Sequence, residues 1–98
     1  MKNWFKSVYL FICDQALKIN SDDYYAWKSR GITLEKLGRY EEAIASYDQA
    51  LKIKPDDYEV WNDRGNALSN LGRNEEAIAS FDKALAIQPD FTREKIDQ

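Results

Sequence analysis

Few residues in this 98-residue chain could perform covalent or acid–base chemistry. The chain has no histidine and one cysteine, Cys13, which excludes a histidine-activated nucleophile and a zinc site built from Cys and His ligands. The remaining candidates are acidic pairs at 22–23, 41–42, 56–57 and 75–76. The pairs recur at an interval of 34 residues, which favours roles in helix capping over a glycosidase carboxylate pair or a calcium site. We therefore expect no catalytic residue, no metal and no cofactor.

The composition is that of a globular domain, with 44% hydrophobic and 32% charged residues and a net charge of −3. Lysine and arginine are spread along the chain, so no cluster predicts nucleic-acid binding. No apolar run is long enough for a transmembrane helix. The apolar stretch 8–13 lacks the small-residue cleavage site of a signal peptide. A lone cysteine excludes an internal disulfide and is compatible with a reducing compartment, and we expect a cytoplasmic location.

An internal repeat organises the chain. When residues 24–57 are aligned with 58–91, 20 of the 34 positions are identical. The segment DQALKI occurs at 14–19 and again at 48–53, and DKALAI follows at 82–87. A period of this length is typical of solenoid proteins, in which each repeat is one supersecondary unit.

Each repeat has the pattern of two helices. In the first repeat, Trp27 and Leu34 follow helical spacing, Gly38 supplies a C-terminal stop, and Pro55 ends the unit. Small residues such as Gly31 are expected where two helices approach closely. The spacing predicts helices near 3–19, 24–37, 41–53, 58–71 and 75–87, in an all-α fold.

These residues resemble the tetratricopeptide repeat (TPR) family. The signature positions in the two full units are Trp27, Gly31, Leu34, Ala43, Tyr47, Ala50 and Pro55, then Trp61, Gly65, Leu68, Ala77, Phe81, Ala84 and Pro89. Arg30 and Arg64 depart from the family's usual leucine, and Leu34 and Leu68 from its frequent tyrosine. The resemblance implies a right-handed α–α superhelix of about two and a half helical hairpins. We interpret 1–98 as a single domain, with a half repeat at 3–20, full repeats at 24–57 and 58–91, and a tail or cap at 92–98.

The resemblance also implies a function, the binding of a peptide or partner protein on a concave face lined by the first helix of each unit. Ser29, Lys36 and Ser69 are among the outward positions there. The predicted groove residues are Tyr25, Lys28, Ile32, Glu35, Glu59, Asn62, Asp63, Asn66 and Asn70. A merely solvated helix face is the alternative for these positions.

One family subtype does not fit. Members that clamp the C-terminal carboxylate of chaperones have Lys and Asn four residues apart on one first helix, and Asn on the next. Lys28 fits the first position, but Ile32 stands at the second and Asp63 at the third, where its charge would repel a carboxylate. We expect no binding of chaperone tails.

The N-terminal segment aligns with the second helix of a preceding unit, and it is far more apolar than its copies. Cys13 takes the place of the core aromatic Tyr47, which predicts a buried, inert thiol. The predicted oligomer interface is Trp4, Phe5, Val8, Tyr9, Phe11 and Ile12. In place of the last four, the next copy carries Glu42, Ala43, Ala45 and Ser46.

Three interpretations of this apolar segment stay open. The aromatic side chains fold back and cover the end of the solenoid, or they contact another protein or a membrane surface, or they form a homo-oligomer by isologous pairing or exchange of the end helix. We predict the oligomer. A structural element for self-assembly through this helix is accordingly the alternative to a module that binds partners through its groove.

Overall fold

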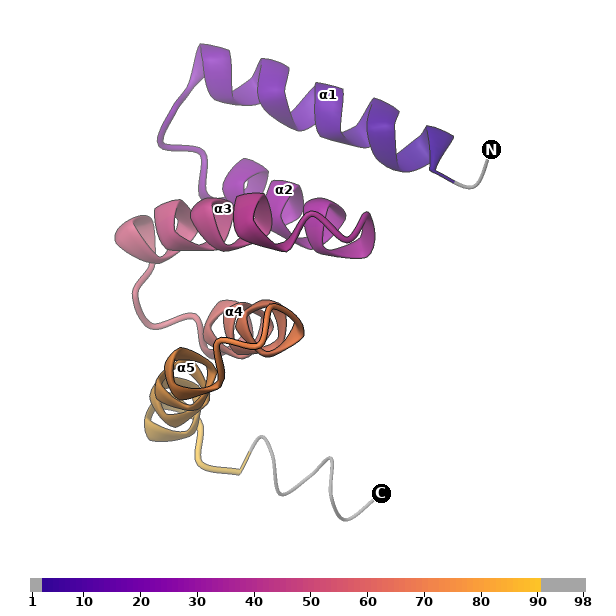
Figure 1. Ribbon diagram of the computed structural model, residues 1–98. Helices are drawn as coiled ribbons and strands as arrows, with labels where there is room; N and C mark the ends of the chain where they lie inside the picture. The colour runs from indigo at the N-terminus through magenta and orange to yellow at the C-terminus, as the bar shows by residue number, and fades with distance from the viewer. Residues whose placement is uncertain (1–2, 91–98) are drawn as a thin grey trace.

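The computed structural model describes residues 3–90, and within this range it contains helices and no strand (Figure 1). The helices are α1 (Trp4–Ile19), α2 (Tyr24–Lys36), α3 (Tyr40–Ile53), α4 (Tyr58–Asn70) and α5 (Asn74–Ile87). Each begins and ends within one residue of its predicted range. The predicted tail or cap at 92–98 lies outside the described residues. None of the helices in the described range has the length and apolarity needed to cross a membrane.

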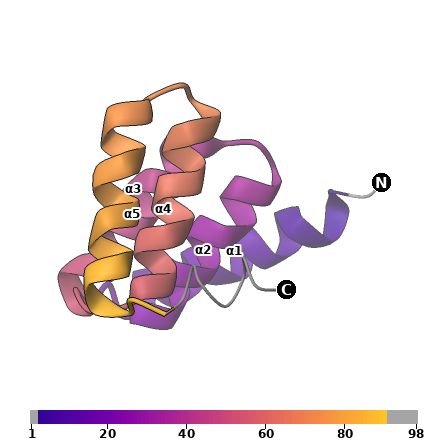
Figure 2. The ribbon, with the colours of Figure 1, turned by 90° about the horizontal axis from the view of Figure 1, so that it is seen from below.

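The helices form hairpins that stack in chain order. Consecutive helices contact each other, and α2 also contacts α4, so the first helices of the two full repeats form a layer of their own. Figure 2 shows α4 and α5 side by side as one hairpin, with α1 at the far end of the stack. This arrangement is an all-α helical repeat solenoid.

Aspartate and glycine define the two ends of α2 and of α4. Gly38 and Gly72 each have a φ of +78°, the left-handed conformation in which glycine avoids the strain of a side chain. After each of these glycines the chain turns back, and the Arg39 amide donates to the Leu34 carbonyl at 2.9 Å. At the opposite ends, the Asp23 carboxylate accepts from the Ala26 amide and the Asp57 carboxylate from the amides of Glu59 and Val60.

The core is centred on Tyr47, whose side chain is fully buried. Its ring lies against Gly31 of the same hairpin, where a Cβ atom would overlap the ring. The same ring packs with Leu34 and with Val60 of the next hairpin, both fully buried. One aromatic residue therefore joins two hairpins, and the glycine opposite it is required for the close approach.

A polar network also joins successive units. The Arg30 guanidinium donates to the Asp14 carboxylate at 2.8 Å and to the Ser46 hydroxyl at 2.5 Å. Arg64 makes the same pair of contacts one repeat later, with Asp48 at 2.7 Å and Ser80 at 2.6 Å. These two arginines are the positions that depart from the family's leucine, and the network gives the departure a physical reason.

Candidate functional site

The predicted groove residues lie on the layer formed by α2 and α4. Tyr25 is 70% exposed, with its ring against that of Tyr24 and the Lys54 ammonium group 5.2 Å from its centre. Asn66 and Asn70 are exposed one turn apart, and the Asn70 side chain donates to the Asn66 carbonyl at 2.9 Å. The layer therefore presents one large aromatic ring on α2 and amide groups on α4.

A hollow of about 250 Å³ lies between the two first helices and is called the α2–α4 hollow below. Its lining comprises Ile32, Glu35, Lys36, Tyr40, Tyr47, Asp63 and Asn70. Four of the predicted groove residues, Ile32, Glu35, Asp63 and Asn70, thus meet in one place. Tyr25, Lys28, Glu59, Asn62 and Asn66 are not part of this lining.

The floor of the α2–α4 hollow carries negative charge. The Tyr47 hydroxyl donates to the Glu35 carboxylate at 2.6 Å. Burial, followed by this hydrogen bond, raises the pKa of Tyr47 far above its ordinary value, so the phenol stays protonated and keeps Glu35 in place. Asp63 and Lys36 line the same hollow. Such a surface suits hydrogen-bond donors and cationic side chains, with Ile32 available for an apolar group.

Lys28 has a structural partner. Its ammonium group lies 3.0 Å from the Asp57 carboxylate and 3.7 Å from that of Glu59, so it links the start of α2 to the start of α4. Partial burial raises the pKa of Asp57, and the amides of Val60 and Glu59 partly offset this effect. Lys28 and Glu59 therefore connect neighbouring hairpins at the rim of the face.

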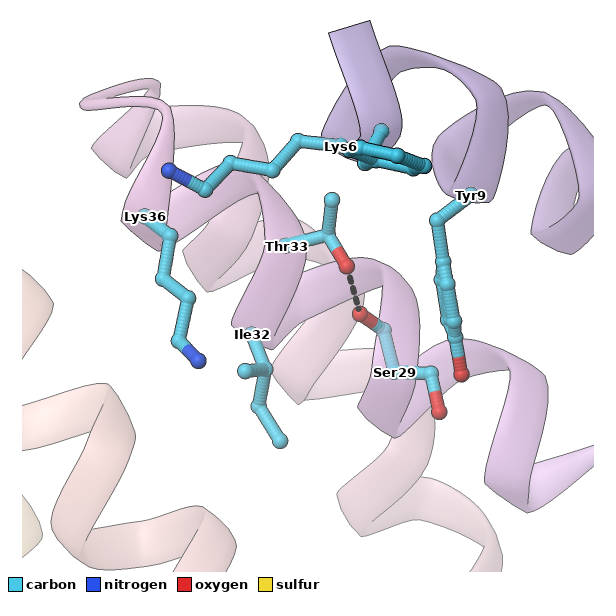
Figure 3. Close-up of a pocket in the computed structure, with 7 residues that line it drawn as sticks. Lys6, Tyr9, Ser29, Ile32, Thr33 and Lys36 are labelled. Atoms are coloured by element: carbon cyan, nitrogen blue, oxygen red, sulfur yellow. Dashed lines mark hydrogen bonds between the residues drawn. The ribbon is translucent and has the colours of Figure 1, made fainter. Parts of the chain in front are cut away.

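A second hollow, of about 430 Å³, lies between α1 and α2 and is called the α1–α2 hollow below (Figure 3). Its lining comprises Phe5, Lys6, Tyr9, Ser29, Ile32, Thr33 and Lys36. It brings together Phe5 and Tyr9, which were predicted as an oligomer interface, and Ile32, which was predicted as a groove residue. Because Ile32 and Lys36 line both hollows, the two form one continuous surface.

The predicted interface residues on α1 are all exposed. The exposed fractions are 61% for Trp4, 74% for Phe5, 40% for Val8, 44% for Tyr9, 62% for Phe11 and 59% for Ile12. Trp4 and Phe5 touch edge to face, with ring centres 4.7 Å apart, but this contact leaves both mostly exposed. The side chains therefore do not fold back to cover the end of the solenoid.

A third hollow, of about 750 Å³, lies where α1, α2 and α3 meet. Its lining comprises Phe11, Asp14, Gln15, Leu17, Lys18, Trp27, Arg30, Ala45 and Gln49. It contains the Arg30–Asp14 pair, and of the residues singled out from the sequence as a site it includes only Phe11. We assign it to the packing of the hairpins.

Cys13 is 4% exposed, and burial raises the pKa of its thiol. The described residues hold no group of three or more His, Cys, Asp or Glu side chains arranged for a metal ion. Sequence reasoning missed Lys6, Thr33 and Tyr40, which line the two hollows. A signal was present for one pair, since Lys6 and Tyr40 are 34 residues apart and line corresponding hollows.

The comparisons agree with this geometry. A family model described as tetratricopeptide repeat matches residues 14–58 and 29–90, which together span most of the chain. The chain belongs to the tetratricopeptide repeat family. Members of this family are protein-interaction modules, which is the general class of function that the family assigns to this chain.

Solved structures show the same fold. The structure named "MamA MSR-1 C2" is 25% identical with a TM-score of 0.82, over 86% of this chain and 48% of that one. "MamA D159K mutant 2" is 28% identical with a TM-score of 0.78, over 81% and 43%. YrrB, described as "a TPR protein with an unusual peptide-binding site", is 24% identical with a TM-score of 0.83, over 89% and 45%. The chain thus spans about half the length of these proteins. No curated protein matches it in sequence.

Proposed function

We propose that this TPR domain is a non-catalytic module that binds a peptide or a partner protein through the face formed by α2 and α4. The observation that carries the proposal is the α2–α4 hollow, in which Ile32 lies beside the carboxylates of Glu35 and Asp63. YrrB, a protein of the same fold, is described as having a peptide-binding site, and this description supports the assignment.

The chemistry of the hollow indicates the ligand. An apolar side chain would contact Ile32, and a lysine or arginine would approach Glu35 and Asp63. Side-chain amides on α4, at Asn62 and Asn66, can donate to and accept from an extended peptide backbone. A basic, partly apolar segment is therefore the class of ligand that we expect. Of the other predicted groove residues, Asn70 lines the hollow, and Tyr25, Lys28 and Glu59 belong to the same proposed face.

A peptide selected from a displayed random library against the full chain tests the proposal. We expect the double variant Asn62→Ala/Asn66→Ala to bind it at least tenfold more weakly, measured by fluorescence anisotropy. Alanine is the better helix former, so the loss would not come from unfolding. Gln49→Ala/Lys52→Ala on α3 is the matched control and should bind like the unaltered chain. Equal binding by all three proteins would refute the assignment.

Self-assembly through α1 is a second candidate function, favoured by the exposed apolar surface. On a helical wheel, positions 4, 5, 8, 9, 11, 12, 15, 16 and 19 form one arc on the side away from the buried Cys13, and none of them is charged. Four aromatic and two β-branched side chains of this arc, 40% to 74% exposed, offer area of the order of the ~800 Å² that each partner buries in a standard interface.

We propose on this ground that the chain forms a dimer or higher oligomer through Trp4, Phe5, Val8, Tyr9, Phe11 and Ile12. Sedimentation at tens of micromolar should show a species heavier than the 11.4 kDa chain. Polar substitution of Phe5, Val8 and Ile12 should return it to the monomer while binding at the α2–α4 face persists. A monomer from the unaltered chain would exclude this candidate. The single buried thiol accords with the cytoplasmic location that we propose.

A further inference from the structure

The α1–α2 hollow is the counterpart, one repeat earlier, of the α2–α4 hollow. Three pairs of lining residues lie 34 positions apart: Lys6 and Tyr40, Ser29 and Asp63, and Lys36 and Asn70. Each hollow therefore has an equivalent wall, made of the second helix of one unit and the first helix of the next. In the earlier hollow this wall is α1 and α2, and in the later one it is α3 and α4.

The two hollows differ in the helix that lies opposite this wall. In the α2–α4 hollow the opposing side is a helix, α2, which contributes Ile32, Glu35 and Lys36. In the α1–α2 hollow no helix among residues 3–90 occupies the corresponding place. The consequence is visible at Tyr9, which is 44% exposed, whereas its equivalent Ala43 is fully buried beneath α2. The geometry of the repeat thus leaves room for one more helix.

We propose that the α1–α2 hollow binds an amphipathic α-helix of a partner protein, which lies antiparallel to α1 and parallel to α2 and carries acidic residues in its last turn. This site adjoins the α2–α4 hollow, with which it shares Ile32 and Lys36, but Asn62 and Asn66 do not line it. Because it uses Phe5 and Tyr9, it is the alternative to self-assembly through those two residues. The orientation follows from the repeat, because α2 has this relationship to α3 and α4.

Charge supports the orientation and the acidic turn. Lys6 is in the first turns of α1 and Lys36 is the last residue of α2, and Figure 3 shows both ammonium groups at the same end of the hollow, away from Tyr9. The C-terminal end of the bound helix would lie there, where cations stabilise its macrodipole and its acidic side chains. Asp23 lies at the opposite end of α2, before its first residue. It is 34 positions before Asp57, which pairs with Lys28.

The apolar side of the bound helix is also specified. The Ser46 hydroxyl accepts a hydrogen bond from the Arg30 guanidinium. The residue 34 positions earlier, on α1, is Ile12. An arginine of the bound helix, at the position equivalent to Arg30, would face Ile12 and have no hydroxyl to donate to. An apolar residue such as leucine is therefore expected at that position. Phe5 and Tyr9 extend the same apolar wall, with Ile32 opposite.

A second copy of α1 fits this place poorly. Laid antiparallel in the hollow, it would bring Lys18, the basic residue of its last turn, close to Lys6 and Lys36. It has no acidic residue in that turn to offset the repulsion. The charges therefore favour a different protein as the source of the helix.

A synthetic peptide tests the proposal. Its sequence is that of residues 23–38 of this chain with two substitutions, and it carries a fluorophore for anisotropy. Arg30→Leu places an apolar side chain against Ile12, and Lys36→Glu places a carboxylate near Lys6 and Lys36 of the full chain. We expect saturable binding to the full chain. The variant Lys6→Glu/Lys36→Glu should bind at least tenfold more weakly, and it should prefer a second peptide with lysine at positions 35 and 36. Lys52→Glu/Lys83→Glu, on exposed positions of α3 and α5, is the control with the same change in net charge.

Three outcomes would overturn the proposal. The first is the absence of binding, and the second is binding that the charge reversal at Lys6 and Lys36 leaves unchanged. The third is a dimer that the peptide dissociates in sedimentation, which would make a second copy the occupant. Failure here is distinct from failure of the proposed peptide groove, because the Asn62→Ala/Asn66→Ala variant should bind this helical peptide normally.

Discussion

The Arg30 guanidinium lies 2.8 Å from the Asp14 carboxylate, and this ion pair joins the N-terminal helix to the first full hairpin. Arg64 and Asp48 repeat it at 2.7 Å between the two full hairpins. Each arginine also satisfies a buried serine hydroxyl, and its guanidinium carbon lies about 6 Å from a tryptophan ring centre. A contact that recurs with the repeat and joins successive units is a structural element of the solenoid, and it can be tested by substitution.

We predict that Arg64→Ala destabilises the protein by about 1–3 kcal/mol. The substitution leaves the buried Ser80 hydroxyl without its partner and removes a half-buried ion pair. Arg64→Lys should rescue only part of the loss, because an ammonium group cannot reproduce the forked contact to Asp48 and Ser80. Urea unfolding followed by circular dichroism measures both.

Arg39→Ala is the matched control for this prediction. Arg39 pairs with Glu42 at 2.7 Å on the surface of a single helix, where solvent screens the interaction. We expect little change in the unfolding midpoint. A similar loss in Arg39→Ala and Arg64→Ala would show that the pair between units stabilises the protein no more than a pair within one unit.

We predict that Gly31→Ala lowers the free energy of unfolding, although alanine normally stabilises a helix by about 1 kcal/mol relative to glycine. The added Cβ would overlap the buried Tyr47 ring, and overpacking of this kind costs about 1–3 kcal/mol or more. Ser69→Ala, at an exposed position of α4, should be neutral or slightly stabilising. If Gly31→Ala gained stability in thermal unfolding, the close approach of glycine and ring would be wrong.

The Cys13 thiol should react slowly in the folded protein. It is 4% exposed and burial raises its pKa, so at pH 8 little thiolate is present and the reagent has poor access. We expect labelling by Ellman's reagent to be roughly 100-fold slower than in denaturant, because it requires local unfolding. A Cys13→Ala/Ala79→Cys variant, with the thiol at an exposed site, should react rapidly. Equal rates would contradict the burial.

The order and bounds of the helices followed from the sequence because each signal is local. Apolar spacing marks the buried stripe of each helix, and Gly38 and Gly72 mark the ends of α2 and α4. The ion pairs of Arg30 and Arg64 did not follow from the sequence. Their partners, Asp14 and Asp48, belong to the preceding unit and are identified only by the packing of helices.

The site was predicted less completely than the fold. Sequence spacing placed Lys28 on the outward face, but not within reach of Asp57, because that distance depends on how two hairpins are offset. The spacing also separated Phe5 and Tyr9 from Ile32, which the structure joins in one hollow. Contacts between units are set by the angle between hairpins, and a helical wheel contains no such information.

The binding face itself is tested most directly by a nuclear magnetic resonance titration of the ¹⁵N-labelled chain with a peptide selected against it. If the first helices form the interaction face, the largest shifts will fall on α2 and α4, at Ile32, Asn62, Asn66 and Asn70, and leave Gln49, Lys52 and Lys83 on α3 and α5 unchanged. The opposite pattern, with shifts confined to α3 and α5, would contradict the assignment of the interaction face to the first helices.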